Sequence, residues 1–151
     1  MKLTDILSKD CLRVPLLGCD KRSVIMELVD LLQGAGQLIN RDAVFQAVWA
    51  REQIRSTGIG EGLAVPHAKT QGCLRLTMAV GKPAEPLEFE SADRRPCGLV
   101  VLLTGPVASA GPHLQALAQI SRLWLTPSFR SAAVEARTAE ELFNLFESNQ
   151  S

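Results

Sequence analysis

The stretch CGLVVLL, from Cys97 to Leu103, decides the fold class because none of its positions carries a charged or strongly polar side chain. A strand with one solvated face alternates apolar and polar residues, whereas a continuous apolar run indicates a strand that is covered on both faces. We therefore expect residues 97–103 to lie at the centre of a covered sheet.

Further strand candidates precede this stretch. They are Cys11–Leu16, Leu76–Gly81 and Leu87–Glu90. Pro15 lies inside the first of them, and because proline has no N–H group to donate, it is confined to the edge or the end of a sheet. We expect Cys11–Leu16 to form such an edge or terminal strand.

Two helices are predicted after the first strand. Asp20 can cap a helix that Gly34 and Gly36 end, and Asn40 can cap a second helix that runs to the neighbourhood of Gln53. The apolar residues of the first helix follow helical spacing, at Val24, Ile25, Leu28, Leu31 and Leu32.

Three more helices are predicted after the last strand. Pro112 suits the first position of one, and Pro127 starts the next. Thr138 with Glu141 forms a capping box for the last. The predicted order is two helices, a block of strands and then helices, in one α/β (α+β) domain over residues 1–151.

The composition excludes several classes of function. The chain has 16 Lys+Arg and 16 Asp+Glu residues, so it lacks the positive charge of a nucleic-acid-binding protein. No segment approaches the roughly 18 apolar residues of a membrane span, and the N-terminus lacks the apolar core of a signal peptide. The four cysteines show no C-x-x-C spacing and lie in or beside apolar runs. We expect a cytoplasmic protein with reduced cysteines and no direct membrane insertion.

The chemistry is expected at His67, which follows a glycine-rich segment. Alternating glycines precede it, at Gly58, Gly60 and Gly62. Because each glycine costs a helix about 1 kcal/mol relative to alanine, residues 54–70 are expected to form a loop that feeds a short strand ending at Pro66.

The same segment supplies groups that can bind phosphate. The hydroxyls of Ser56 and Thr57 and the backbone N–H groups at glycines such as Gly58 are potential donors. The guanidinium of Arg51 would add a charged donor. A neutral imidazole at His67 is already a nucleophile and needs no strong base to attack phosphorus.

The residues alone leave other interpretations open. A histidine after a proline at a strand end is usually a solvated turn residue, and this segment is not a P-loop because no Gly-Lys-[Ser/Thr] follows its glycines. His113, the only other histidine, begins a helix, where the macrodipole favours the neutral ring. It can therefore donate to an anion, or it is a plain surface residue. A metal site of His67, His113 and a cysteine lacks ligand spacing, so we expect no metal and no cofactor.

The run EQIRSTGIGEGLAVPHA, from Glu52 to Ala68, resembles the active-site signature of the fructose/mannitol-type (type 2) enzyme IIA domains of the bacterial phosphotransferase system. An acidic residue, six positions, Ile-Gly, two positions, then Leu-Ala-Val-Pro-His and a small residue match in order. The likeness covers nearly the whole chain, from a similar start at Leu3–Pro15 to Pro112-His113-Leu114, which resembles the second histidine of the family. Pro112 departs from the polar residue expected there. A free-standing domain with this start most resembles the nitrogen-regulatory branch.

The resemblance implies a mixed central sheet flanked by helices on both faces. It also implies that His67 is the phosphohistidine, on its Nε2 atom, that Arg51 and His113 support it, and that Ser56 and Thr57 have lesser roles. The expected donor is an HPr-type phosphocarrier. Two functions remain open: a nitrogen-regulatory-type signalling protein whose regulatory partners read its phosphorylation state, and a sugar-transport component that passes phosphate to a IIB domain of a fructose/mannitol-type permease.

Overall fold

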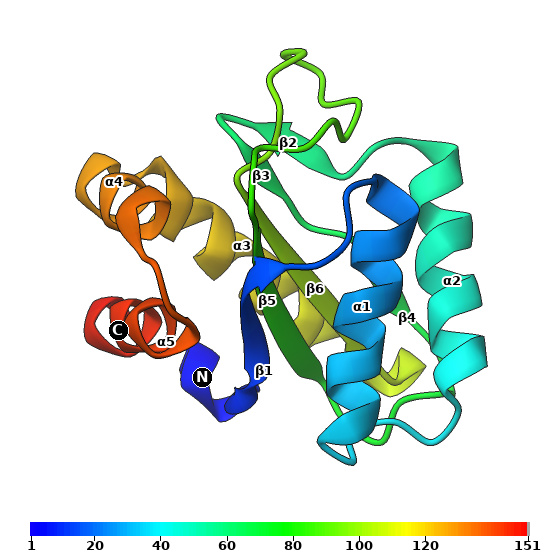
Figure 1. Cartoon of the computed structure of the whole chain (residues 1–151). Coiled ribbons are helices and arrows are strands. Elements are labelled where there is room, and N and C mark those ends of the chain that lie inside the picture. The colour runs from blue at the N-terminus through cyan, green and yellow to red at the C-terminus, as the bar shows by residue number, and fades with distance from the viewer. Residues whose placement is uncertain (151) are drawn as a thin grey trace.

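A mixed six-stranded sheet forms the middle of the computed structural model, which describes residues 1–150 (Figure 1). Its strands are β1 (Leu7–Leu16), β2 (Gly58–Gly60), β3 (Leu63–Ala64), β4 (His67–Lys69), β5 (Thr77–Pro83) and β6 (Leu99–Gly105). Their order is β1-β5-β6-β3-β2, and β4 also pairs with β6. The β5–β6 and β2–β3 pairs are antiparallel, whereas β1–β5, β3–β6 and β4–β6 are parallel.

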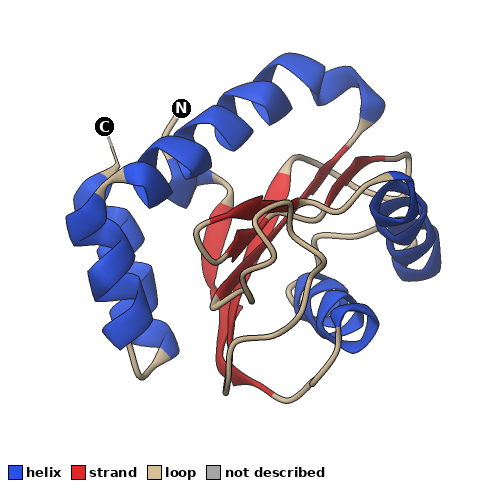
Figure 2. Ribbon diagram, turned by 90° about the horizontal axis from the view of Figure 1, so that it is seen from above, coloured by secondary structure: helices blue, strands red, loops and turns tan. Residues whose placement is uncertain are grey.

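Helices cover both faces of this sheet, as Figure 2 shows from above. The helices are α1 (Lys21–Gly34), α2 (Arg41–Ile54), α3 (Ala110–Leu125), α4 (Pro127–Glu135) and α5 (Ala139–Asn149), with short 3-10 helices at η1 (Leu3–Asp5) and η2 (Val107–Ser109). The first two lie on one face and the last three on the other. The predicted fold class is therefore confirmed. Within residues 1–150, no helix combines the length and the apolar character that crossing a membrane requires.

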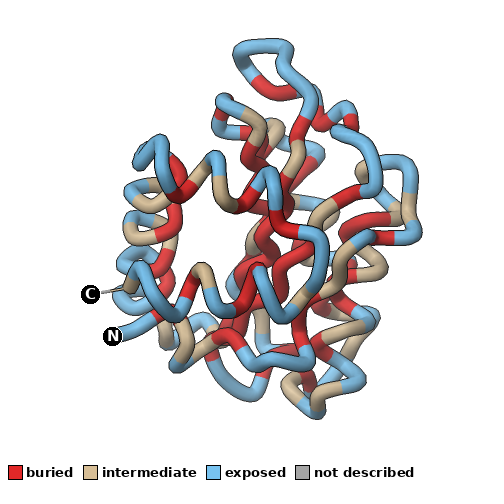
Figure 3. Tube along the Cα trace, turned by 60° about the vertical axis from the view of Figure 1, so that its left-hand side comes forward, coloured by how far each residue is buried: buried red, intermediate tan, exposed pale blue. Residues whose placement is uncertain are grey.

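The core is built around β6, all of whose residues are buried. This confirms the central, covered strand predicted from residues 97–103, although β6 begins later, at Leu99, and ends at Gly105. In Figure 3 the buried segments follow the strands and the inward sides of the helices. The edge position predicted for the first strand is also confirmed, although β1 begins at Leu7, earlier than expected.

Local signals place most helix starts correctly. The side chains of Asp20, Asn40 and Thr138 each accept a hydrogen bond from the backbone N–H three residues further on. The capping box at Thr138 is only half formed, because the Glu141 carboxylate accepts from the N–H of Arg137 at 2.8 Å instead of closing on Thr138. In α3, Pro112 is the third residue and not the first, since the helix begins at Ala110.

Two predictions about strands were wrong. Leu87–Glu90 is not a strand: Leu87 forms one isolated bridge with Cys97, and Glu90 has a φ of 57°, which turns the chain out of the extended conformation. Residues 54–70 are not a loop with one strand ending at Pro66, because they contain three short strands and β4 begins at His67 itself.

Candidate functional site

A tight turn between β2 and β3 precedes the site along the chain. Gly60, Glu61 and Gly62 have φ values of 98°, 56° and 87°, a conformation that glycine adopts without steric cost. After this turn, β3 pairs in parallel with β6, and Leu63 lies opposite Leu99.

His67 is held by the backbone just before it. It opens β4, opposite Leu103 of the parallel strand β6, and its Nδ1 lies 2.8 Å from the carbonyl oxygen of Val65. Because a carbonyl oxygen can only accept, Nδ1 must carry the proton. The neutral ring then keeps its lone pair on Nε2.

The surroundings of His67 favour this neutral ring. Its pKa is lowered, chiefly by partial burial and further by the charges of Arg51 and Lys69. The bond to Val65 and the charge of Glu52 oppose this shift without reversing it. At neutral pH the side chain is therefore mainly an unprotonated nucleophile.

His113 comes from α3 and meets His67 across the end of the sheet. The two ring centroids are 5.6 Å apart, and the ring planes form an angle of 61°. His113 is 4% exposed, and neither of its ring nitrogens has a hydrogen-bond partner within residues 1–150. Burial, then the charges of His67 and Lys69, lower its pKa to about 4. The interpretation of His113 as a plain surface residue was wrong: its neutral ring carries an N–H group without an acceptor within residues 1–150, and both ring nitrogens are buried.

Two clefts flank His67, and both are also lined by Arg51 and Leu117. One, of about 530 Å³, extends over Arg55 and residues 56–59, and the other, of about 570 Å³, extends over Lys69 and His113. Arg51 donates to the carbonyl oxygen of Arg55 at 2.8 Å. Within the described residues, Arg51, Arg55 and Lys69 form no ion pair. The site therefore offers several cations to an anion.

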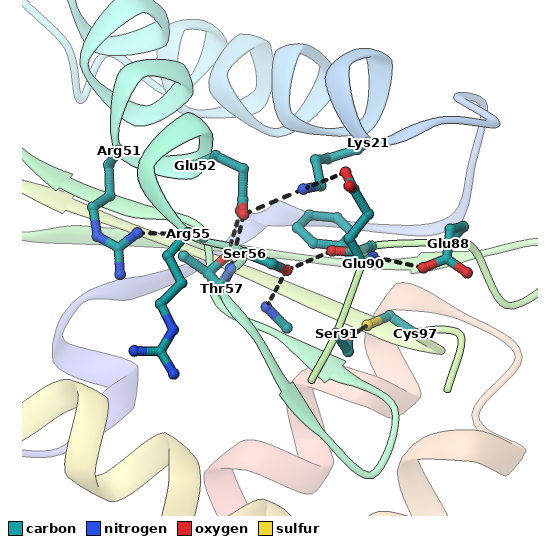
Figure 4. Close-up of polar contacts among 12 residues, drawn as sticks. Lys21, Arg51, Glu52, Arg55, Ser56, Thr57, Glu88, Glu90, Ser91 and Cys97 are labelled. Carbon is teal, nitrogen blue, oxygen red and sulfur yellow. Dashed lines mark hydrogen bonds and ion pairs between the residues drawn. The ribbon is translucent and has the colours of Figure 1, made fainter. Parts of the chain in front are cut away.

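The predicted phosphate-binding donors are turned elsewhere (Figure 4). The Ser56 hydroxyl donates to the carbonyl oxygen of Phe89 at 2.5 Å and accepts from the Gly58 N–H at 3.1 Å. Thr57 gives both its N–H and its hydroxyl to the carboxylate of Glu52, at 2.8 and 2.5 Å. Phosphate can use these donors only by displacing bonds already made. A phosphate-binding role for Ser56, Thr57 and Gly58 thus stays a prediction, and their present contacts do not support it.

Sequence reasoning did not single out three charged residues of this region. Lys69 lies two positions after His67 on one strand, a spacing that puts both side chains on the same face. Arg55 lies one position beyond the end of α2, in extended backbone, so helical spacing does not account for its place in the cleft. Glu52 was noted only as the start of the signature, and its complete burial had no signal in the sequence.

The cysteines form no metal site with the histidines among the described residues. Cys11, Cys73 and Cys97 are buried, Cys19 is exposed, and all are free thiols. Among the residues that the structure describes, no group of three His, Cys, Asp or Glu side chains has the arrangement of a metal site.

Comparison with known proteins gives a consistent picture. A family model described as "Phosphoenolpyruvate-dependent sugar phosphotransferase system, EIIA 2" matches residues 5–149. The chain is 34% identical over 145 residues to the fructose-specific EIIABC component of Bacillus subtilis, and the match covers 96% of this chain but only 23% of that protein. A nitrogen regulatory protein of Pseudomonas aeruginosa is 30% identical over 145 residues, which cover 96% of this chain and 94% of the relative. A fructose-specific EIIA component of Haloferax volcanii is 34% identical over 120 residues, which cover 80% of this chain and 78% of the relative.

Solved structures share the fold. The nitrogen regulatory protein IIA-Ntr of Neisseria meningitidis superposes with a TM-score of 0.82 at 27% identity, covering 94% of this chain and 97% of that one. The mannitol IIA of Escherichia coli has a TM-score of 0.78 at 18% identity, covering 92% and 97%, and supports the fold alone. On the family match over residues 5–149, the chain belongs to the type 2 EIIA family of the phosphoenolpyruvate-dependent sugar phosphotransferase system and is a component of a phosphoryl-transfer relay.

Proposed function

We propose that this protein accepts a phosphoryl group on Nε2 of His67 from an HPr-type phosphocarrier, and that its phosphorylation state acts as a nitrogen-regulatory-type signal. One observation carries the proposal: Nδ1 of His67 bonds to the carbonyl oxygen of Val65, so the lone pair is on Nε2, in a ring that lies beside His113 and lines both clefts with Arg51.

The transfer is a displacement at phosphorus. The Nε2 lone pair of His67 forms the new N–P bond while the N–P bond to the donor imidazole breaks, and that electron pair returns to the donor nitrogen. The proton on Nδ1 stays in its bond to Val65, whose carbonyl dipole stabilises the positive charge that develops on the ring. The Arg51 guanidinium would bind phosphoryl oxygens, and the free N–H of neutral His113 would donate to another.

The choice between signalling and transport rests on the relatives. The signalling function is supported by nitrogen regulatory proteins that this chain matches over nearly their whole length. The alternative, a sugar-transport component that passes phosphate to a IIB component, is supported by the 34% identity to fructose-specific EIIA proteins. A cytoplasmic location remains a prediction from the sequence.

Phosphorylation can be tested directly. Incubation with a phosphorylated HPr-type donor is expected to add one acid-labile phosphate per chain, and His67→Ala is expected to abolish it. Labelling that persists in the His67→Ala variant would exclude His67 as the acceptor.

A second experiment separates the two functions. Pull-downs from a lysate compare His67→Ala with the charge mimic His67→Asp, because a phosphoryl group adds about two negative charges to the surface. Signalling predicts different partner sets for the two variants. Identical partner sets, together with transfer of the labelled phosphate to a purified fructose-type IIB domain, would favour transport instead.

A further inference from the structure

A buried carboxylate lies next to the site without touching His67. Glu52 is in the last turn of α2, and its side chain is fully buried. The macrodipole disfavours a negative charge at this end of a helix, and burial disfavours it further. The neighbouring Arg51 carries the favourable positive charge of the same turn. Helix stability therefore gives no reason for an acid at position 52.

The contacts of Glu52 explain how the charge is accommodated. Its two oxygens accept the N–H and the hydroxyl of Thr57, and Lys21 of α1 approaches Oε2 at 3.5 Å (Figure 4). Lys21 also approaches Glu90 at 3.3 Å, so it is shared between two acids. The carboxylate thus clamps one residue of the segment that leads into β2.

From Thr57 the hydrogen bonds continue to the imidazole. The carbonyl oxygen of Thr57 accepts from the N–H of Val65 at 3.0 Å, and the carbonyl oxygen of Val65 lies 2.8 Å from Nδ1 of His67. A continuous path therefore runs from Glu52 through Thr57 and Val65 to the proton that leaves Nε2 free. Each bond in the path orients the group that makes the next one.

We infer that Glu52 is a positioning residue, which acts through Thr57 and Val65 to hold His67 in the orientation and tautomer that expose the Nε2 lone pair. This inference rests on the proposed function, since it assigns a role in the same phosphoryl acceptance. It also gives Thr57 a different role from direct phosphate binding, because both its donors serve the clamp.

Three variants test the path. Glu52→Ala removes the clamp. Glu52→Gln keeps it in altered form, because the amide oxygen can accept the Thr57 N–H while the amide nitrogen donates to the hydroxyl. Thr57→Val removes the hydroxyl bond alone and keeps the side-chain shape.

Glu27 offers a matched control in α1. Its carboxylate also accepts loop N–H groups, those of Leu17 and Gly18, and also pairs with a cation, Arg13. It lines neither cleft beside His67. Glu27→Ala should therefore reproduce the loss of stability caused by Glu52→Ala without its effect on His67.

Two measurements are made on each variant at equal folded fraction. Nitrogen-15 NMR of unphosphorylated protein at pH 8 reports the His67 tautomer, and rapid-quench labelling with phosphorylated HPr-type donor reports the rate and its dependence on donor concentration. We expect Glu52→Ala to mix the tautomers and to slow phosphorylation about tenfold or more at saturating donor, since misplacement of a reacting group costs rate in this way. Glu52→Gln should keep most of the phosphorylation rate, and the rate of Thr57→Val should lie between those of Glu52→Gln and Glu52→Ala. Glu27→Ala should match the wild type.

The outcomes separate this inference from the proposed function. A wild-type tautomer and a wild-type rate in Glu52→Ala would overturn the inference even if His67 is the phosphorylated residue. A fall in the phosphorylation rate of Glu27→Ala as large as that of Glu52→Ala would also overturn the inference. If the wild type accepts no phosphate, the proposed function fails, and the tautomer measurement still decides whether Glu52 positions the ring.

Discussion

Acidification from pH 7 to pH 5 is expected to weaken the fold through His113. This ring is 4% exposed, and burial lowers its pKa to about 4. In the unfolded chain a histidine titrates near 6.5. Between these two values the unfolded chain binds a proton that the folded chain does not, so the free energy of unfolding falls as the pH falls.

The size of the effect follows from the two pKa values. One pKa unit corresponds to about 1.4 kcal/mol, and at pH 5 the unfolded histidine is largely protonated while the folded one is not, which amounts to a loss of about 2 kcal/mol relative to pH 7. For a chain of 151 residues this lowers the melting temperature by about 4–8 °C. Hydrogen bonds lower the pKa values of two carboxyl groups, chiefly from Ser23 to Asp20 and from Glu61 to Asp93. These two groups therefore reduce the free energy of unfolding further, at more acidic pH. Acidification also reduces the free energy of unfolding through His67, because the pKa of His67 is lowered in the folded chain as well.

The assay compares the wild type with His113→Asn, which cannot titrate. Urea unfolding at pH 7, 6 and 5 should show a loss on acidification that is about 2 kcal/mol larger in the wild type than in the variant. Proton NMR of the His113 ring should give a midpoint well below 6.5 and below that of an unfolded histidine. Equal pH dependence in the two proteins, or a midpoint near 6.5, would refute the reasoning.

Three further substitutions have defined expectations. Arg51→Ala should slow phosphorylation by about 10²-fold, because it removes a charged donor from the site, and should lower the melting temperature only slightly, through loss of the exposed bond to the Arg55 carbonyl and of the positive charge in the last turn of α2; a labelling rate like that of the wild type would contradict this role. Gly81→Ala should lower the free energy of unfolding by about 1–3 kcal/mol, measured in urea, because a Cβ there would lie 2.5 Å from the buried Leu16 side chain; unchanged stability would mean that this contact yields freely. Thr138→Ala should cost about 1 kcal/mol in the same measurement through loss of the α5 cap, and no cost would mean that the cap is replaced by water.

Features encoded over a few residues were predicted well. Caps at Asp20 and Asn40 were predicted because the side chain and the N–H it accepts from are only three positions apart. The central strand β6 was predicted because burial on both faces requires a continuous apolar run. The strand proposed at Leu87–Glu90 failed because an apolar pair, Leu87 and Phe89, can be buried by a turning segment as well as by a strand.

By itself the sequence determined the family, the fold class and the histidine at which chemistry is expected, because signature, periodicity and caps are all short-range patterns. Tertiary structure alone decided which groups meet. His113 reaches His67 because β4 lies beside β6 and α3 follows β6, and the pairing of strands is set by packing across the whole sheet. The sequence gives no sign that the hydroxyls of half-buried Ser56 and buried Thr57 are already hydrogen-bonded, but a hydroxyl withdrawn from water bonds to whatever acceptor the fold brings within reach. Here those acceptors are the Phe89 carbonyl and the Glu52 carboxylate, and no local pattern specifies that choice.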